Sequence, residues 1–256
     1  MIDSRAIIHP DTCIAPEVSI GPFAVIGPHV EIGAGSKIGA HTIIHRNTKI
    51  GLNNDIDAFV SLGGDPQHLH YKGEETFLEI GNENIIREFC TLNRGTIQGG
   101  GMTRLGNKNL LMAYVHIAHD CLLGNETVLA NNAGLAGHVS VGDYAVFSAF
   151  SGVHQFVKIG AYSFLGRAAK VVQDIPPYVL VTGNPGSPRG INLVGLKRHG
   201  FSESTLRILR RAYSLLYRQG VQLQDAIDQL NIMSESCPEL MPFVEMLKDS
   251  KRGIAR

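Results

Sequence analysis

Aliphatic residues recur at every sixth position along two long stretches of the chain. The first ladder runs from Ile2 to Leu62, and the second runs from Leu105 to Val171. The residue two places before each ladder position is mostly small or β-branched, as at Val18. Because successive side chains of a strand point to opposite faces, this spacing predicts short strands with both positions directed inward. Such a strand cannot bury its own apolar face, so the repeat predicts coils that stack on one another.

Glycine often follows the ladder residue in the first stretch. It does so at Gly21, Gly27, Gly33, Gly39 and Gly51. A residue without Cβ suits a sharp corner of the backbone, so we expect each hexad to be a strand followed by a turn at the glycine.

The repeat resembles that of the hexapeptide-repeat folds. This resemblance implies that three hexads form one triangular coil of 18 residues and that the coil winds left-handed, unlike the usual right-handed crossover. Neighbouring coils are then about 4.8 Å apart, the normal strand spacing. We therefore expect residues 1–190 to form an all-β left-handed parallel β-helix.

Two segments interrupt the ladder. Residues 63–78 lack the pattern for the length of two hexads, after which Ile80 resumes the old register, and residues 93–104 shift the register by one. Both segments are expected to be loops that leave the prism. Loops on a rigid scaffold commonly carry binding residues.

The repeat ends near Asp174, where an Asp-Ile-Pro-Pro sequence breaks any regular element. A loop containing GNPGSPRG follows. Leucines at helical spacing after Ser202, with two shorter helical patterns at 222–231 and 238–249, predict three helices. Residues 191–256 should therefore form a small C-terminal α-helical domain that caps the open end of the β-helix.

Composition limits the classes of function. Lys+Arg and Asp+Glu each total 23, so no global basic field suggests nucleic acid as a partner. The N-terminus has no apolar run of signal-peptide length, and no segment is long and apolar enough to predict a membrane span. The four cysteines occur singly, which favours a reducing, cytoplasmic location and argues against disulfides or a thiol-based metal site.

Four histidines of the second ladder avoid the two inward positions of their hexads. They are His116, His119, His138 and His154. Since 18 residues correspond to one coil, His119 lies below Gly137, which in turn lies below Gln155. We therefore expect an outward patch of histidines on three successive coils, about 5 Å apart.

Two chemistries use such a patch. In general-base acyl transfer, a neutral imidazole such as His119 removes the proton of an attacking hydroxyl, and a backbone N–H stabilises the oxyanion. Gly137 suits the second role because it has no side chain to block its N–H, and Asp120 is placed to orient the imidazole. Several histidines on adjacent coils also suit a zinc centre, as in hexapeptide-repeat carbonic anhydrases. The spacing alone leaves both alternatives open.

Longer segments carry a more specific resemblance. They are residues 109–143 (NLLMAYVHIAHDCLLGNETVLANNAGLAGHVSVGD), VHQF at 153–156, QDIPPYV at 173–179, GLKRHGFS at 195–202, MIDSRAIIHP at 1–10 and RGTIQGGG at 94–101. Together they resemble the UDP-N-acetylglucosamine 3-O-acyltransferase family over essentially the whole chain. The resemblance implies the first acylation of lipid A biosynthesis, without metal or other cofactor.

The resemblance also implies roles for individual residues. His119 matches the catalytic base, Gly137 matches the oxyanion donor, and Asp120 is adjacent to the base. Matches to the substrate-binding cleft are Gln67, His116, His138, His154, Gln155, Asn192 and Arg198. The partners implied are acyl-carrier protein, UDP-N-acetylglucosamine and two further copies of the chain in a homotrimer. The acidic carrier would be steered by basic residues, namely Lys197, Arg198, Arg207, Arg210, Arg211 and Arg218.

Three positions depart from the family pattern. A loop that commonly reads Gln-Asp-Leu-Lys here reads Gln67-His68-Leu69-His70, which replaces a substrate-contacting carboxylate and a lysine with imidazoles. Arg167 occupies the acyl-chain ruler position, which is usually small or apolar, and Val194 replaces an acid. The expected reaction is transfer of a (R)-3-hydroxyacyl chain to the 3-hydroxyl of UDP-N-acetylglucosamine. Alternatives are the same transfer to a 3-amino sugar nucleotide and, in another class, zinc carbonic anhydrase activity.

Overall fold

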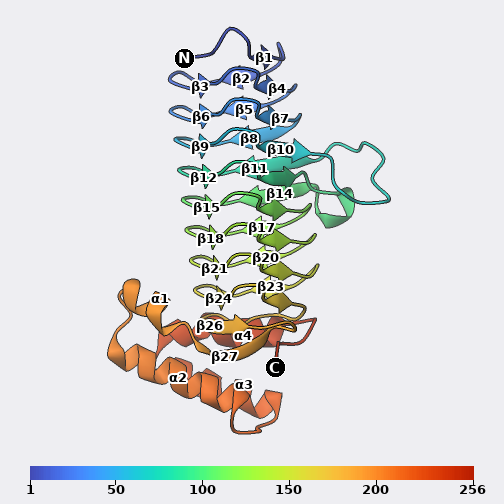
Figure 1. Ribbon diagram of the computed structural model, residues 1–256. Helices are drawn as coiled ribbons and strands as arrows, with labels where there is room; N and C mark the ends of the chain where they lie inside the picture. The colour runs from blue at the N-terminus through green and yellow to red at the C-terminus, as the bar shows by residue number, and fades with distance from the viewer.

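The computed structural model describes residues 1–256 as a triangular prism of stacked strands with a helical tail at one end (Figure 1). Its three faces are β-sheets whose strands alternate along the chain and run parallel, except for the last strand of the third sheet. The first face contains β1 (Ile7–Ile8), β4 (Val25–Ile26), β7 (Ile43–Ile44), β10 (Ser61–Gly64), β13 (Thr91–Asn93), β16 (His116–Ile117), β19 (Gly134–Leu135), β22 (Gly152–Val153) and β25 (Lys170–Val171).

The other two faces follow the same order. The second face contains β2 (Cys13–Ile14), β5 (Glu31–Ile32), β8 (Thr48–Ile50), β11 (Phe77–Ile80), β14 (Met102–Leu105), β17 (Leu122–Leu123), β20 (Ser140–Val141) and β23 (Lys158–Ile159). The third face contains β3 (Ser19–Ile20), β6 (Lys37–Ile38), β9 (Asp55–Ile56), β12 (Ile85–Ile86), β15 (Leu110–Leu111), β18 (Val128–Leu129), β21 (Val146–Phe147), β24 (Phe164–Leu165), β26 (Val179–Thr182) and β27 (Ser187–Ile191).

The strand register confirms the 18-residue coil. His116 pairs with Gly134, and Gly134 pairs with Gly152, each one coil further along. The ladder residues fill the interior, where Ile44 and Leu129 are completely buried. The parallel β-helix expected from the repeat, and its left-handed winding expected from the resemblance to hexapeptide-repeat folds, are confirmed by this topology and by the solved structures that the chain matches.

The turn geometry differs from the prediction. The glycines after the ladder residues do not have positive φ; the left-handed residue lies two places later, as at Phe23 (φ 60°) and Asp120 (φ 61°). Glycine is required instead by the approach of the next coil, since a Cβ at Gly33 would lie 2.5 Å from the carbonyl oxygen of Gly51. The left-handed residue of the turn was therefore predicted two positions too early. A left-handed turn and a close backbone approach both favour a residue without Cβ, so a glycine in the sequence does not distinguish them.

Two connecting segments leave the prism on the same side, residues 65–76 between β10 and β11 and residues 94–101 between β13 and β14 (Figure 1). Because of these segments, paired residues on neighbouring coils are more than 18 positions apart in the sequence. The separation is 30 residues between Leu62 and Leu92 and 25 between Ile80 and Leu105. The sequence ranges 63–78 and 93–104 thus include flanking residues that form strands. A short helix, η1 (Ile97–Gly99), lies in the second segment.

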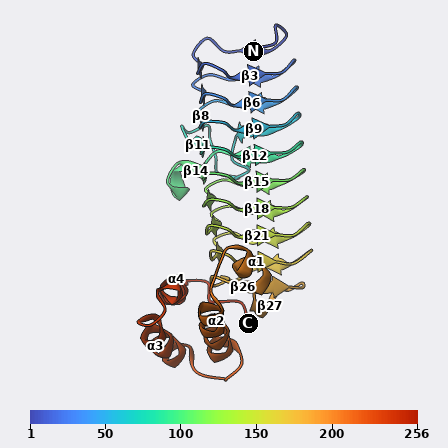
Figure 2. The same cartoon turned by 90° about the vertical axis from the view of Figure 1, so that its left-hand side faces the viewer.

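The GNPGSPRG segment (residues 183–190) was predicted to be a loop, but its second half belongs to β27, which forms an antiparallel pair with β26 at the end of the third face. The tail then contains α1 (Leu193–Arg198), α2 (Glu203–Tyr217), α3 (Leu223–Ser234), η2 (Pro238–Leu240) and α4 (Met241–Asp249). The three predicted helices are present as α2, α3 and α4. These helices pack across the end of the prism (Figure 2). Tyr178 Oη links the two parts by donating a hydrogen bond to the carbonyl of Glu239 at 2.7 Å. None of the helices is long and apolar enough to cross a membrane.

Candidate functional site

His119 and Asp120 form a hydrogen-bonded pair at the corner that follows β16. The His119 Nδ1 and Asp120 Oδ2 atoms are 2.7 Å apart, and the two side chains are 10% and 1% exposed. A carboxylate accepts but does not donate, so Nδ1 carries the proton and Nε2 is left with its lone pair. The pair therefore has the arrangement of an oriented general base.

The carboxylate of Asp120 is held by residues that the sequence did not single out. Asp120 Oδ1 accepts from the Thr96 N–H and Oδ2 accepts from the Thr96 hydroxyl, both at 2.7 Å. The N–H of Asp120 donates to Thr103 Oγ1 at 2.7 Å, and a Cβ at Gly99 would overlap the carboxyl group. The 94–101 segment thus covers Asp120 and fixes the side chain that orients His119.

Other imidazoles surround His119. Its ring centroid lies 5.1 Å from that of His138 and 5.3 Å from that of His68, and His70 lies 5.6 Å beyond His68. Burial lowers the pKa of His138, although Asp120 opposes this effect, and the neighbouring imidazoles add to it. Burial and then His119 lower the pKa of His116, whose Nδ1 lies 2.8 Å from Thr91 Oγ1. The pKa values of both rings therefore favour the neutral form at pH 7.

Gly137 lies one coil beyond His119, as the coil arithmetic predicted. A Cβ on Gly137 would lie 2.5 Å from Cε1 and 2.8 Å from Nε2 of His119. Gly137 accepts a hydrogen bond from Phe156, but its own N–H donates to no protein acceptor. A buried N–H without a partner, next to a base, is the kind of donor that an oxyanion needs.

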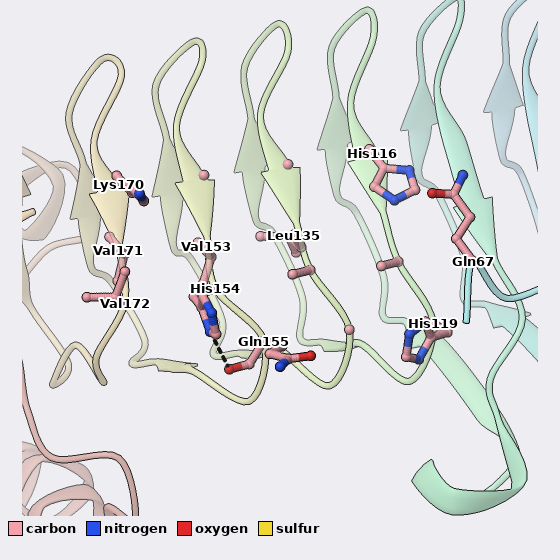
Figure 3. Close-up of a pocket in the computed structure, with 15 residues that line it drawn as sticks. Gln67, His116, His119, Leu135, Val153, His154, Gln155, Lys170, Val171 and Val172 are labelled. Atoms are coloured by element: carbon pink, nitrogen blue, oxygen red, sulfur yellow. Dashed lines mark hydrogen bonds between the residues drawn. The ribbon is translucent and has the colours of Figure 1, made fainter. Parts of the chain in front are cut away.

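A pocket of about 560 Å³ runs from His119 and Gly137 along the first face towards the tail (Figure 3). Six of the predicted site residues line it, namely Gln67, His116, His119, Gly137, His154 and Gln155. A Cβ at Gly134 or Gly152 would meet no atom within 4 Å, so these glycines leave its floor open. At the tail end Val172 is partly exposed, whereas Val153 and Val171 are buried ladder residues below the pocket surface. The sequence did not single out Lys170, which lines the same end as an exposed cation.

The remaining predicted residues lie outside the lining of this pocket. His138 lines a neighbouring pocket with Phe156, on the other side of the corner. Asn192 caps α1, accepting from the Gly195 N–H at 3.1 Å and donating to the carbonyl of Tyr162 at 2.9 Å.

Arg198 and Arg167 also lie outside the pocket lining. Arg198 ends α1 and is exposed. Arg167 is exposed, with its guanidinium 5.9 Å from the centroid of the Phe150 ring. The proposed roles of these two residues in nucleotide and acyl-chain binding stay predictions.

One cluster has the composition of a metal site. Ligand atoms of His119, Asp120 and His138 lie within 4.8 Å of one another. However, His119 Nδ1 and Asp120 Oδ2 are at hydrogen-bonding distance, and Asp120 also accepts twice from Thr96. This donor set is thus already used to orient an imidazole, which favours the base over the zinc alternative.

Arg94 fastens the 65–76 segment over the site. Its side chain is 1% exposed and bonds to the carbonyl of Gly63 and the carboxylate of Asp65, and Nη2 donates to Tyr71 Oη at 3.1 Å. The same segment supplies Gln67 and His68, so Arg94 positions part of the pocket without lining it.

We expect Arg94→Met to loosen this segment. KM for the acceptor should rise about 10-fold with a smaller change in kcat, because substrate positioning rather than proton transfer is lost. Limited proteolysis should cut the variant faster within residues 65–76. Arg87→Met is the control, because Arg87 forms its ion pairs at 51% exposure and does not line the pocket. An unchanged KM with unchanged proteolysis would rule out the anchoring role.

Comparison with known proteins gives consistent relatives. The family model described as Udp N-acetylglucosamine O-acyltransferase, Domain 2, matches residues 174–255. A protein from Thiobacillus denitrificans named acyl-[acyl-carrier-protein]–UDP-N-acetylglucosamine O-acyltransferase is 51% identical over 98% of this chain and 100% of its own. Solved structures of LpxA from Acinetobacter baumannii and of UDP-N-acetylglucosamine O-acyltransferase (LpxA) from Moraxella catarrhalis are 48% and 45% identical. Both have a TM-score of 0.98 and match over 100% of this chain and 99% of theirs.

Proposed function

Because the chain belongs to the acyl-[acyl-carrier-protein]–UDP-N-acetylglucosamine O-acyltransferase family, we propose that it acylates the 3-hydroxyl of UDP-N-acetylglucosamine. The donor is a (R)-3-hydroxyacyl chain on acyl-carrier protein, and the reaction is the first step of lipid A biosynthesis. The observation that carries the proposal is that His119, oriented by Asp120, lines one pocket together with Gly137, whose N–H is free.

The proposed chemistry assigns one role each to His119, Asp120 and the N–H of Gly137. His119 Nε2 removes the proton of the acceptor hydroxyl as its oxygen bonds to the thioester carbon, and Asp120 stabilises the imidazolium that forms. The N–H of Gly137 donates to the oxyanion of the tetrahedral intermediate. When the C–S bond breaks, the thiolate of the carrier takes the proton from His119.

The two ends of the pocket suit the two substrates. Gln67 and His116 provide polar contacts near His119 for the sugar, together with His68 and His70 of the same segment (Figure 3). Towards the tail, the open floor at Gly134 and Gly152 and the partly exposed Val172 leave room for the acyl chain, beside the cation of Lys170.

The pocket of one chain does not include every residue of the proposed cleft. Asn192, Arg198 and Arg167 lie outside its lining, while His154 and Gln155 are exposed on its rim. A homotrimer that seats a neighbouring prism against this face would bring further residues to the site, and we include it in the proposal. A cytoplasmic location also belongs to the proposal, supported by four cysteines that are all free thiols.

Mass spectrometry of the reaction products tests the proposal. The purified protein receives UDP-N-acetylglucosamine or its 3-amino analogue, each with 3-hydroxyacyl-carrier proteins of graded chain length. A single ester product is expected. A preferred amide product would instead assign His68 and His70 to a 3-amino acceptor, and the product of preferred length would report the effect of Arg167. No product from any pair would contradict acyl transfer.

A further inference from the structure

A second pocket, of about 290 Å³, lies away from the proposed active site, where the tail meets the end of the prism. It is formed by β27, the last turn of α2, the turn before α3 and the C-terminal residue. Its lining consists of Pro188, Arg189, Tyr213, Leu216, Tyr217, Arg218, Gly220, Val221, Gln222 and Arg256. The proposed catalytic pair and the predicted sugar-nucleotide and acyl-chain contacts lie outside it. Of its residues, only Arg218 belongs to the basic set predicted to steer the carrier protein.

Three guanidinium groups from separate segments line this pocket, and none of its lining residues has an acidic side chain. Arg189, Arg218 and Arg256 take part in none of the ion pairs of the structure. Arg189 Nε donates a single bond, to Thr182 Oγ1 at 3.3 Å. The remaining N–H donors of these side chains are free, and guanidinium donors match the oxygens of phosphate groups.

Two neutral features add to the same surface. The hydroxyl of Tyr217 is buried without a hydrogen-bond partner, and burial raises the pKa of this phenol, so it stays protonated and can donate. The turn of Gly220 and Gln222 leads into α3, a helix of 12 residues whose N-cap makes no side-chain bond. The free amides at such an N-terminus carry partial positive charge, which Asp225 in the first turn only partly offsets.

We infer that this pocket binds the phosphate group of a small organic phosphomonoester. The three arginines and Tyr217 would face the phosphate dianion, whereas Tyr213, Leu216 and Val221 provide apolar walls for a ring or short chain attached to it. The volume is at the lower end of the range for ligand pockets, roughly 300 Å³ upward, so the organic part is small. Such a ligand would join β27, α2 and α3 at the point where the tail meets the prism.

Phenyl phosphate is a suitable probe, with phenol and inorganic phosphate as its separate halves. Isothermal titration of the full-length protein at about 150 mM salt should show one saturable site for phenyl phosphate. Arg218→Gln should weaken binding about 10-fold and Tyr217→Phe about 5-fold, in line with loss of a charge-assisted and a neutral hydrogen bond. Arg211→Gln is the matched control, an exposed arginine of α2 outside the pocket, and should bind as the unaltered protein does.

The affinities measured for the three probes and for the variants each test one part of the inference. Weaker binding of inorganic phosphate and no binding of phenol support recognition of an organic phosphomonoester. Equal affinity for inorganic phosphate would overturn the apolar half of the inference. Unchanged binding in both Arg218→Gln and Tyr217→Phe would overturn the site itself. The titration measures binding without acyl transfer, so its outcome is independent of the proposed reaction.

Discussion

His119→Ala is expected to lower kcat/KM by about 10²–10⁴-fold, the usual contribution of a general base. Nε2 of His119 is the basic nitrogen of the oriented pair, and no other imidazole of the cluster has a carboxylate as close as 2.7 Å. His138 is the nearest substitute, but its Nε2 lies 3.5 Å from Asp120 Oδ2. The loss should therefore appear mainly in kcat, measured by product formation at saturating substrate.

The fold of this variant should remain intact. His119 points away from the interior of the prism, and Asp120 keeps both bonds from Thr96 when the imidazole is removed. Thermal unfolding of the variant should thus stay close to that of the unaltered protein. His9→Ala, which removes an exposed imidazole far along the chain, should change neither activity nor unfolding. Full turnover in His119→Ala would refute the assignment of the base.

The fold could be predicted from the sequence because every coil repeats the same pattern of buried and exposed positions. A ladder residue such as Ile44 is buried in each hexad, so the pattern specifies the strand and its inward face, while the register of 18 residues came from the resemblance to hexapeptide-repeat folds. The coil spacing also placed Gly137 next to His119, a contact between residues 18 positions apart. Wherever the repeat is intact, the separation of two residues in the sequence predicts their positions on the prism.

This prediction fails where the repeat is interrupted. Thr96 contacts Asp120 from an inserted segment, after which paired residues are 25 positions apart, so counting in hexads could not predict the contact. The hairpin β26–β27 likewise follows the last coil, where ladder spacing no longer applies. His119 was expected on an outward patch, but it is only 8% exposed, with His68 of the first inserted segment beside its ring and Asp120 held by Thr96 of the second. The insertions thus convert an outward histidine into a sheltered base.

Gly137→Ala is expected to produce the second large effect, a fall in kcat/KM of about 10²-fold. The new methyl group would lie within 2.8 Å of Nε2 of His119, closer than two such atoms can approach. Backbone of the next coil cannot yield easily, so the imidazole must turn, and its bond to Asp120 then breaks. Displacement of a catalytic group by about 1 Å costs roughly this factor. Gly190→Ala is the matched control, because a Cβ there meets no atom within 4 Å.

A double-mutant cycle identifies how Gly137→Ala acts. Alanine retains the backbone N–H, so the substitution removes no oxyanion donor and should act through the displaced imidazole alone. In the His119→Ala background there is no ring to displace, and Gly137→Ala should then cost less than about 3-fold. An equal cost in both backgrounds would show that Gly137 limits the reaction by itself, through the approach of substrate to its N–H. The coupling between the two substitutions therefore separates positioning of the base from stabilisation of the oxyanion.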